Sequence, residues 1–214
     1  VLDYAVLVIS GADGVQGHVQ TLWRLLKRYE IPVFLFVNKM DQPGTDRKKL
    51  LKELQVRLDA NCVEFDMLAD RMEAETQEQL SLCDERMLEE YLEKGEITVE
   101  SIAEAVESRH VFPCYFGSAL RQDGVELLLQ GIETYARCPR YPEEFGARVF
   151  KISRDAAGKR LTYLKVTGGS LRVKMPVNNY GSAGEAEEWE EKADQLRIYN
   201  GAQYEAVEQV DAGG

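Results

Sequence analysis

Asparagine, lysine and aspartate follow a strongly apolar segment in the pattern Asn38-Lys39-Met40-Asp41. An aspartate carboxylate at such a point can accept hydrogen bonds from both the N1–H and the exocyclic N2–H of guanine. Adenine offers neither donor in that arrangement, so the carboxylate would stay unpaired and the two bases would be strongly discriminated. The lysine stem can lie over the base plane, and the asparagine amide can connect this loop to its neighbours. We therefore expect Asn38, Lys39 and Asp41 to bind guanine rather than to form only a capped turn.

A second loop of small residues, Gly117-Ser118-Ala119-Leu120, follows another apolar segment. Small residues allow a ligand to approach the backbone closely, and we expect the N–H of Ala119 to meet the guanine O6, with Ser118 and Leu120 beside it. The string is common in loops and is weak evidence alone. Two base-reading loops at the ends of neighbouring strands of one sheet are a much stronger indication of a guanine site.

Apolar runs and apolar periodicity predict the elements that position these loops. Strands are predicted at 4–9, 33–37 and 111–116, and helices at 15–29, 46–60 and 123–135. Asp13 is a plausible cap of the first helix. Continuous apolar runs are typical of strands that are buried on both faces. The alternation of strands and helices predicts an α/β fold, a parallel sheet with crossover helices that brings both loops to the carboxyl edge, where ligands bind in such sheets.

Residues 64–107 differ from the rest of the first part, since they carry 15 acidic and 3 basic side chains with sparse apolar positions. This composition favours helices on a solvated surface. We therefore predict a domain over 1–138 that contains an acidic helical insert at 64–107.

After a proline-bearing linker the periodicity changes. Residues 147–153 and 161–167 alternate between apolar and polar types, and the turn-forming segment 155–158 joins them. Helical spacing is absent from this part except for an ambiguous stretch at 185–192. The pattern predicts an antiparallel β-barrel domain over 146–214.

The barrel segment is basic although the whole chain has a net charge of −11. Residues 146–178 hold eight basic side chains and one acid, Asp155, so these cations have few local acids to pair with and cannot all be buried on alternating strands. One explanation is an ordinary soluble barrel face, and the other is a patch that contacts RNA phosphates. The predicted RNA contacts are Lys151, Lys159, Arg160, Lys165 and Arg172.

The two loops, the string Asp13-Gly14-Val15-Gln16 and the segment FKISRDAAGKRLTYLKVTGGSL resemble translational GTPases of the elongation factor G branch. The acidic insert and the segment HVFPCYFGSALRQDGVELLL are more similar to tetracycline-resistance ribosomal protection proteins. The resemblance implies a GTP hydrolase that uses GTP or GDP with Mg²⁺ and is triggered on the ribosome, and a β-barrel that contacts the small subunit rRNA. In that family, Asn38, Lys39 and Asp41 would form the fourth GTPase motif, and Ser118, Ala119 and Leu120 the fifth.

The sequence departs from the family in its phosphate chemistry. No Gly-x-x-x-x-Gly-Lys-Ser/Thr loop occurs, so no segment is expected to cradle phosphates or to position magnesium. Three Asp-x-x-Gly strings begin at Asp41, Asp155 and Asp211, but none is followed by histidine, and His18 and His110 have the positions of surface or capping residues.

We therefore expect a piece of a longer protein: a partial P-loop GTPase domain and a truncated barrel. We expect this chain alone neither to hydrolyse GTP nor to retain GTP, GDP or Mg²⁺. The open alternative is a non-hydrolysing ribosome- or RNA-binding module that keeps the guanine loops. A small regulatory GTPase is less favoured, because neither the barrel nor the long insert belongs to that class.

The composition indicates a cytoplasmic protein that does not enter membranes. The longest apolar runs are far shorter than the ~20 residues of a transmembrane helix. The four cysteines are scattered without a Cys-x-x-Cys spacing, which argues against a zinc site and for reduced thiols. We expect a monomer.

Overall fold

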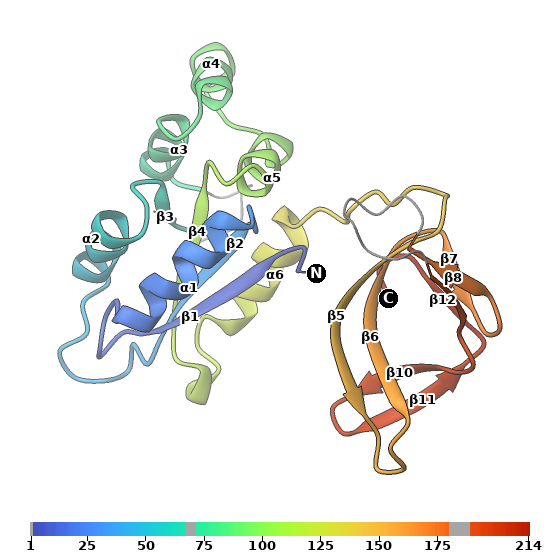
Figure 1. The fold of residues 1–214 in the computed structure, drawn as a ribbon. Helices are drawn as coiled ribbons and strands as arrows, with labels where there is room; N and C mark the ends of the chain where they lie inside the picture. Colours follow the sequence, from blue (N-terminus) through green and yellow to red (C-terminus); the bar gives the residue numbers. More distant parts are fainter. Residues whose placement is uncertain (1, 67–71, 180–188) are drawn as a thin grey trace. The chain divides into compact units, whose positions relative to one another are not determined.

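The computed structural model describes residues 2–66, 72–179 and 189–214, which divide into two compact units, Leu2–Cys138 and Pro139–Gly214 (Figure 1). Each unit has apolar clusters of its own. Within the described ranges, every helix is too short or too polar to cross a lipid bilayer.

The first unit is built on a parallel sheet of four strands in the order β1-β2-β4-β3. The strands are β1 (Ala5–Ser10), β2 (Val33–Asn38), β3 (Cys62–Glu64) and β4 (Phe112–Phe116). Ser10 pairs with Asn38, and Val37 pairs with Phe116, so β1, β2 and β4 end at the same edge. The predicted parallel sheet with crossover helices is confirmed. No strand was predicted at β3, because three residues are too few to form a recognisable pattern.

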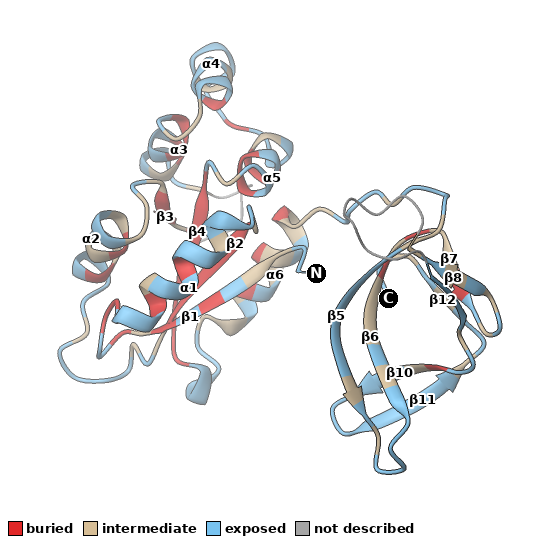
Figure 2. Cartoon of the chain, in the orientation of Figure 1, coloured by how far each residue is buried: buried red, intermediate tan, exposed pale blue. Residues whose placement is uncertain are grey.

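Helices cover both faces of this sheet (Figures 1 and 2). One apolar cluster joins the sheet to α1 (Gly17–Arg28) and α2 (Arg47–Arg57), and another joins it to α5 (Val99–Glu107) and α6 (Val125–Tyr135). This arrangement buries all of β4 and nearly all of β2 on both sides. The two base loops therefore leave the best-packed strands of the sheet.

The prediction that the first strand is buried on both faces is wrong. Val6 and Val8 are exposed, although they pair with Phe34 and Phe36, which are buried. The physical reason is that β1 lies at the edge of the sheet, next to β2 alone in the strand order β1-β2-β4-β3 of the described residues.

Capping residues differ between the first two helices. Asp46 caps α2, since its side chain accepts a hydrogen bond from the N–H of Lys49 at 3.1 Å. Asp13 does not cap α1, because the helix begins after Gln16, whose side chain makes no capping bond. The N–H of Asp13 instead donates to the carbonyl of Ser10, in a turn that precedes the helix.

The acidic segment forms α3 (Ala74–Ser81), α4 (Glu85–Lys94) and α5, while its residues 67–71 lie outside the described residues. The expectation of a solvated insert is only partly right. Leu80, Met87, Ile102 and Val106 are buried in one cluster with Phe34 of the sheet. Each helix turns only a few apolar residues inward, which is why the composition alone suggested a solvated surface.

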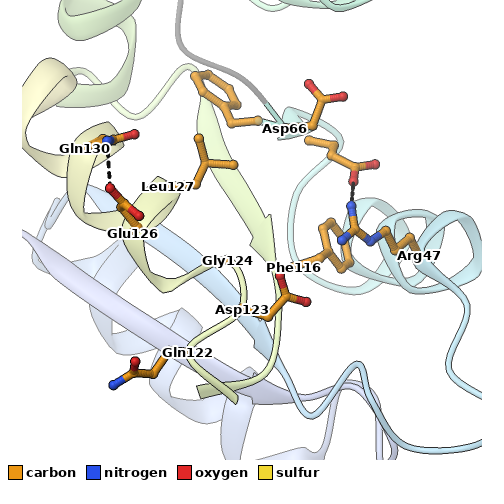
Figure 3. Close-up of a pocket in the computed structure, with 11 residues that line it drawn as sticks. Arg47, Asp66, Phe116, Gln122, Asp123, Gly124, Glu126, Leu127 and Gln130 are labelled. Atoms are coloured by element: carbon orange, nitrogen blue, oxygen red, sulfur yellow. Dashed lines mark hydrogen bonds and ion pairs between the residues drawn. The ribbon is translucent and has the colours of Figure 1, made fainter. Parts of the chain in front are cut away.

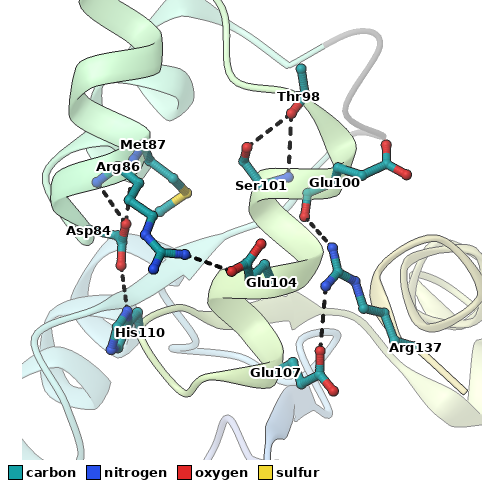
Figure 4. A network of polar contacts seen from close by, with 10 residues as sticks. All are labelled: Asp84, Arg86, Met87, Thr98, Glu100, Ser101, Glu104, Glu107, His110 and Arg137. Carbon is teal, nitrogen blue, oxygen red and sulfur yellow. Dashed lines mark hydrogen bonds and ion pairs between the residues drawn. The ribbon is translucent and has the colours of Figure 1, made fainter. Parts of the chain in front are cut away.

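Polar contacts fix the ends of these helices (Figure 4). Asp84 caps α4 by accepting from the N–H groups of Arg86 and Met87, and it also contacts Nδ1 of His110. Burial alone would raise the pKa of Asp84, but the hydrogen bonds from His110 and the two N–H groups outweigh it and lower that pKa. Arg86 pairs with Glu104 of α5 at 2.8 Å. His110 thus supports a helix cap, in line with the role expected from the sequence.

The second unit consists of antiparallel strand pairs, as predicted. They are β5 (Gly146–Arg154) with β6 (Arg160–Gly168), β7 (Ser170–Arg172) with β12 (Gln209–Asp211), β8 (Pro176–Asn178) with β9 (Glu190–Lys192), and β10 (Leu196–Asn200) with β11 (Gln203–Val207). Val166, Leu171 and Leu196 form their common core. Of the ambiguous stretch at 185–192, residues 190–192 form β9 and residues 185–188 lie outside the described residues.

Candidate guanine-binding site

The side chain of Asn38, at the end of β2, joins the two predicted base loops. Its Oδ1 accepts a hydrogen bond from the N–H of Lys39 at 2.8 Å and from the N–H of Ala119 at 2.9 Å. The sequence predicted this connection. Because both acceptor positions of the oxygen are used, the amide NH₂ group is what this side chain can offer to a ligand.

Backbone hydrogen bonds hold the two loops side by side. The N–H of Met40 donates to the carbonyl of Gly117 at 3.0 Å, and the N–H of Gly117 donates to the carbonyl of Val37 at 3.0 Å. Lys39, between them, has φ of 64°, in the left-handed region, and its side chain is exposed. The loop therefore turns sharply at Lys39 while its flanks are fixed by the neighbouring strand end.

Asp41 is held by the second loop. A hydrogen bond from Ser118 lowers the pKa of Asp41, and the guanidinium of Arg121 acts in the same direction. Arg121 Nε lies 3.4 Å from the carboxylate, whose side chain is 21% exposed. The carboxylate is therefore ionised at neutral pH and can accept two parallel N–H donors.

The second loop needs glycine at its first position. A Cβ at Gly117 would lie 2.1 Å from the carbonyl oxygen of Asp123, a backbone atom that cannot move aside cheaply. The two sides of the loop touch there, because Ser118 and Asp123 exchange N–H···O bonds of 3.0 Å each. A 3₁₀ turn, Ala119–Arg121, closes the loop and leaves Leu120 almost fully exposed.

The N–H of Ala119 was expected to meet the guanine O6, but it donates to Asn38. Contact with a base carbonyl would require this bond to be shared or exchanged. The N–H of Ala119 does not point freely toward a ligand because the amide oxygen of Asn38 is already at hydrogen-bonding distance from it.

Two contributors to the site were not singled out from the sequence. Thr45 closes the first loop, since its hydroxyl lies 2.9 Å from the carbonyl oxygens of both Met40 and Gln42 and can donate to either. Arg121 lies beside Asp41. Neither carries a motif, and a threonine or an arginine in a loop gives no signal until the chain has folded.

These residues suit the base of a guanine nucleotide but not its phosphates. The chain holds no Gly-x-x-x-x-Gly-Lys-Ser/Thr loop. Among the described residues, no group of three or more histidine, cysteine or acidic side chains could hold a metal ion.

A hollow of about 500 Å³ lies next to the second loop, but none of the predicted guanine residues lines it (Figure 3). It is walled by Asp66, Asp123 and Glu126, and by the pair of Arg47 and Glu64, whose charged atoms are 3.5 Å apart. Burial raises the pKa of Glu64 despite that arginine. The lining thus holds four carboxyl groups and one arginine, and this excess of acidic groups disfavours binding of nucleotide phosphates in the hollow.

The predicted RNA contacts divide between different parts of the second unit. Leu164 and Val166 of β6 pack into the core, so Tyr163 and Lys165, which alternate with them, lie on the outer face. Lys151 pairs with Tyr163 in the register of β5 and β6 and shares that face.

The other three predicted contacts have different surroundings. Lys159 lies in the exposed β5–β6 turn, and Arg172 of β7 donates to Gln209. The segment 146–178 was expected to hold too few local acids for its cations, but Arg160 pairs with Glu191 from outside that segment. That acid comes from β9, beyond the segment in which charges were counted.

Comparisons with known proteins identify relatives of this chain. The family described as elongation factor Tu GTP binding domain matches residues 1–137. The oxytetracycline resistance protein of Streptomyces rimosus is 29% identical over 225 residues, covering 93% of this chain and 34% of that protein. Tetracycline resistance protein TetW of Butyrivibrio fibrisolvens is 29% identical over 193 residues, covering 83% and 30%.

Elongation factor G of Aquifex pyrophilus is 25% identical over 280 residues, covering 100% of this chain and 39% of that protein. A crystal structure of a protein from Thermus thermophilus matches with a TM-score of 0.76 at 23% identity, covering 99% of this chain and 37% of that one. That likeness shows the fold. The chain spans about a third of the length of the relatives it matches. With its two linked base loops on a parallel sheet and the family match over 1–137, the chain belongs to the elongation factor G branch of the translational GTPases.

Proposed function

We propose that this chain reads the guanine base, and contacts RNA, for a ribosome-associated GTPase that acts in translation. The observation that carries the guanine assignment is the link between the loops. One side chain, Asn38, binds the backbone of both loops, and Ser118 of the second loop holds the Asp41 carboxylate of the first. A carboxylate that is fixed and ionised in this way selects the N1–H and N2–H donors of guanine.

The relatives support the wider setting. Their names include elongation factor G and two tetracycline resistance proteins. Hydrolysis of GTP, with Mg²⁺ on the phosphates, is proposed for a longer protein that supplies phosphate-binding residues. The outer-face cations of the second unit support contact with the phosphates of ribosomal RNA. Among the predicted contacts, Lys151, Lys159, Lys165 and Arg172 are the ones we retain in this role.

The guanine assignment is tested with the free nucleoside, because guanosine carries no phosphate. A ¹⁵N-labelled sample of the chain is titrated with guanosine and, as a control, adenosine. We expect millimolar binding of guanosine, with shifts concentrated at 38–41 and 117–120, and little response to adenosine. Most nucleotide affinity comes from phosphate contacts, so GDP should bind little better than guanosine.

The matched variant is Asp41→Asn, whose amide can donate to the additional carbonyl of xanthosine. It should lose guanosine binding and gain xanthosine binding. If guanosine shifts the same residues in Asp41→Asn as in the original chain, then Asp41 is only a turn residue. Micromolar GDP binding by the original chain would show that phosphate-binding residues are present after all.

A further inference from the structure

Four aromatic rings form a continuous row across four strands of the second unit. The ring centroids of Phe150 (β5) and Tyr163 (β6) are 6.3 Å apart, those of Tyr163 and Tyr199 (β10) 5.6 Å, and those of Tyr199 and Tyr204 (β11) 5.5 Å. Phe150 is 53% exposed, Tyr199 37% and Tyr204 49%, while Tyr163 is half-buried. Each ring therefore keeps part of its surface open to solvent.

The register places the tyrosines of this aromatic row away from the apolar core. Leu196 of β10 pairs with Val207 of β11, and both pack into the core. Tyr199 and Tyr204 pair with each other three residues further along, so they lie on the opposite, outer face. Tyr163 is on the outer face of β6 for the same reason, because its neighbour Leu164 is inward. The three tyrosines are thus not part of the core around Val166, Leu171 and Leu196.

Cations accompany the rings. Nζ of Lys151 lies 5.1 Å from the centre of the Tyr163 ring, and the guanidinium carbon of Arg197 lies 4.4 Å from that of Tyr204. These are cation–π distances. Lys151 is exposed, whereas the Arg197 side chain is only 18% exposed and pairs with Asp155, so Lys151 is the cation that a group bound on the rings would meet.

The outer face around the row is free of carboxylates on its strands. Arg148 and Lys165 pair with each other on the same face as Lys151, and neither β5 nor β6 contains an acidic residue. The acid of β11, Glu205, pairs with Ile198 on the inner side. The nearest acid that touches the row is Asp155 of the β5–β6 turn, 3.9 Å from Arg197.

We propose that the aromatic row binds a single-stranded segment of RNA, with unpaired bases against the rings and phosphates against the flanking lysine and arginine side chains. Every base has a flat face, so aromatic stacking tolerates any sequence, and arginine planes stack on bases as well. Neighbouring rings are 5.5–6.3 Å apart, more than the ~3.4 Å between stacked bases of one duplex strand. The row therefore suits bases that are separated from one another.

This inference rests on the proposed RNA contact and deepens it, because it names unpaired bases as well as phosphates. A proline-rich peptide is the other ligand that aromatic surfaces bind. Such a peptide carries no negative charge that would complement the cations Arg148, Lys151 and Lys165. The charges of the outer face thus favour RNA.

The test uses the whole chain and a fluorescein-labelled 12-nucleotide oligouridylate, followed by fluorescence anisotropy. A 12-base-pair RNA duplex and a proline-rich decapeptide serve as competitors. We expect the chain to bind the single strand more tightly than the duplex, so the duplex should compete weakly. The decapeptide should not displace the labelled oligouridylate. Replacing Tyr199 and Tyr204 together by leucine should weaken oligouridylate binding at least about fivefold. Replacing both by phenylalanine keeps the rings and should change it less than about twofold.

The salt dependence separates stacking from phosphate contact. The leucine variant should keep the salt slope of the original chain, whereas Lys151→Gln should reduce it by about 0.7. Far-UV circular dichroism and melting curves check that each variant is folded.

Two results would refute the stacking proposal alone: equal affinity of duplex and single strand, or unchanged affinity of the leucine variant while Lys151→Gln binds more weakly. Those results would leave the phosphate contact intact. Displacement of the RNA by the decapeptide would make the row a peptide site. Absence of any RNA binding would remove both proposals, and guanosine binding would be unaffected.

Discussion

Replacing Asn38 by alanine tests how the base loops are held together. The substitution removes the acceptor of two backbone N–H groups, those of Lys39 and Ala119, which lie 2.8 and 2.9 Å from its Oδ1. A hydrogen bond contributes about 1 kcal/mol net, and more when the abandoned donor is buried. Both residues are exposed, so water can replace part of the loss. We expect the free energy of unfolding to fall by about 1–2 kcal/mol.

The assay is urea unfolding of the first unit, followed by the fluorescence of Trp23. This tryptophan is buried in α1 with its ring 4.8 Å from that of Phe112, so it reports on the packed sheet. All variants carry Trp189→Phe, because Trp189 belongs to the second unit and would add a separate signal. With a typical urea dependence of about 2 kcal/mol per molar, the midpoint should fall by about 0.5–1 M.

Asn38→Asp is the matched control, since its carboxylate keeps an acceptor for both N–H groups. It should lose less than half as much stability as Asn38→Ala. If the free energy of unfolding of the alanine variant is within about 0.3 kcal/mol of that of the original chain, the two hydrogen bonds to Asn38 do not stabilise the loops. If the aspartate variant is destabilised as strongly as the alanine variant, the acceptor oxygen is not what stabilises them.

Three further substitutions can be measured by the same urea titration. Gly117→Ala should cost about 2–4 kcal/mol, because its Cβ would lie 2.1 Å from the carbonyl oxygen of Asp123; an unchanged midpoint would mean that this loop yields easily. Tyr115→Phe should leave stability unchanged or raise it by up to about 1 kcal/mol, because the buried hydroxyl has no hydrogen-bond partner among the described residues; a clear loss would reveal one. Asp84→Ala should cost about 1 kcal/mol at pH 7 through loss of the cap of α4. The pKa of Asp84 is lowered in the folded chain, so its contribution is full above the ordinary aspartate pKa of about 3.9 and is lost below it; an equal difference at pH 7 and in acid would contradict this.

The parts of the fold that the sequence predicted are those in which a local pattern repeats over many residues. The segment 33–37 is apolar throughout, and β2 is buried along almost its whole length. The hairpin of β5 and β6 followed from alternation and a turn. By contrast, β3 has three residues, and its place beside β4 depends on pairing across about 50 residues of chain, which no local pattern records.

The residue types of the candidate site and the link through Asn38 were predicted from the sequence, but the backbone group that Asn38 would bind in the second loop was not. The position of Asn38 and Asp41 after a buried strand indicated base recognition. That the N–H of Ala119 would donate to Asn38 depends on the distance between two strand ends, which only the folded sheet defines. The acid that neutralises Arg160 was missed because Glu191 is 31 residues away in sequence. The aromatic row was missed because its rings come from four separate strands.

The two candidate sites differ in charge, and salt should therefore separate them. Guanosine is uncharged, and its binding to Asp41 depends on paired hydrogen bonds, so its affinity should hardly change between ~50 and 200 mM salt. RNA on the outer face would meet the cations Arg148, Lys151, Lys159 and Lys165. For four phosphate contacts on a single strand, the affinity should fall about 50-fold over the same range. The guanosine titration and the oligouridylate titration, each repeated at both salt concentrations, measure this. An RNA affinity that does not respond to salt would remove the cations from the contact, and a guanosine affinity that falls in parallel would show that charge, not base pairing to Asp41, drives its binding.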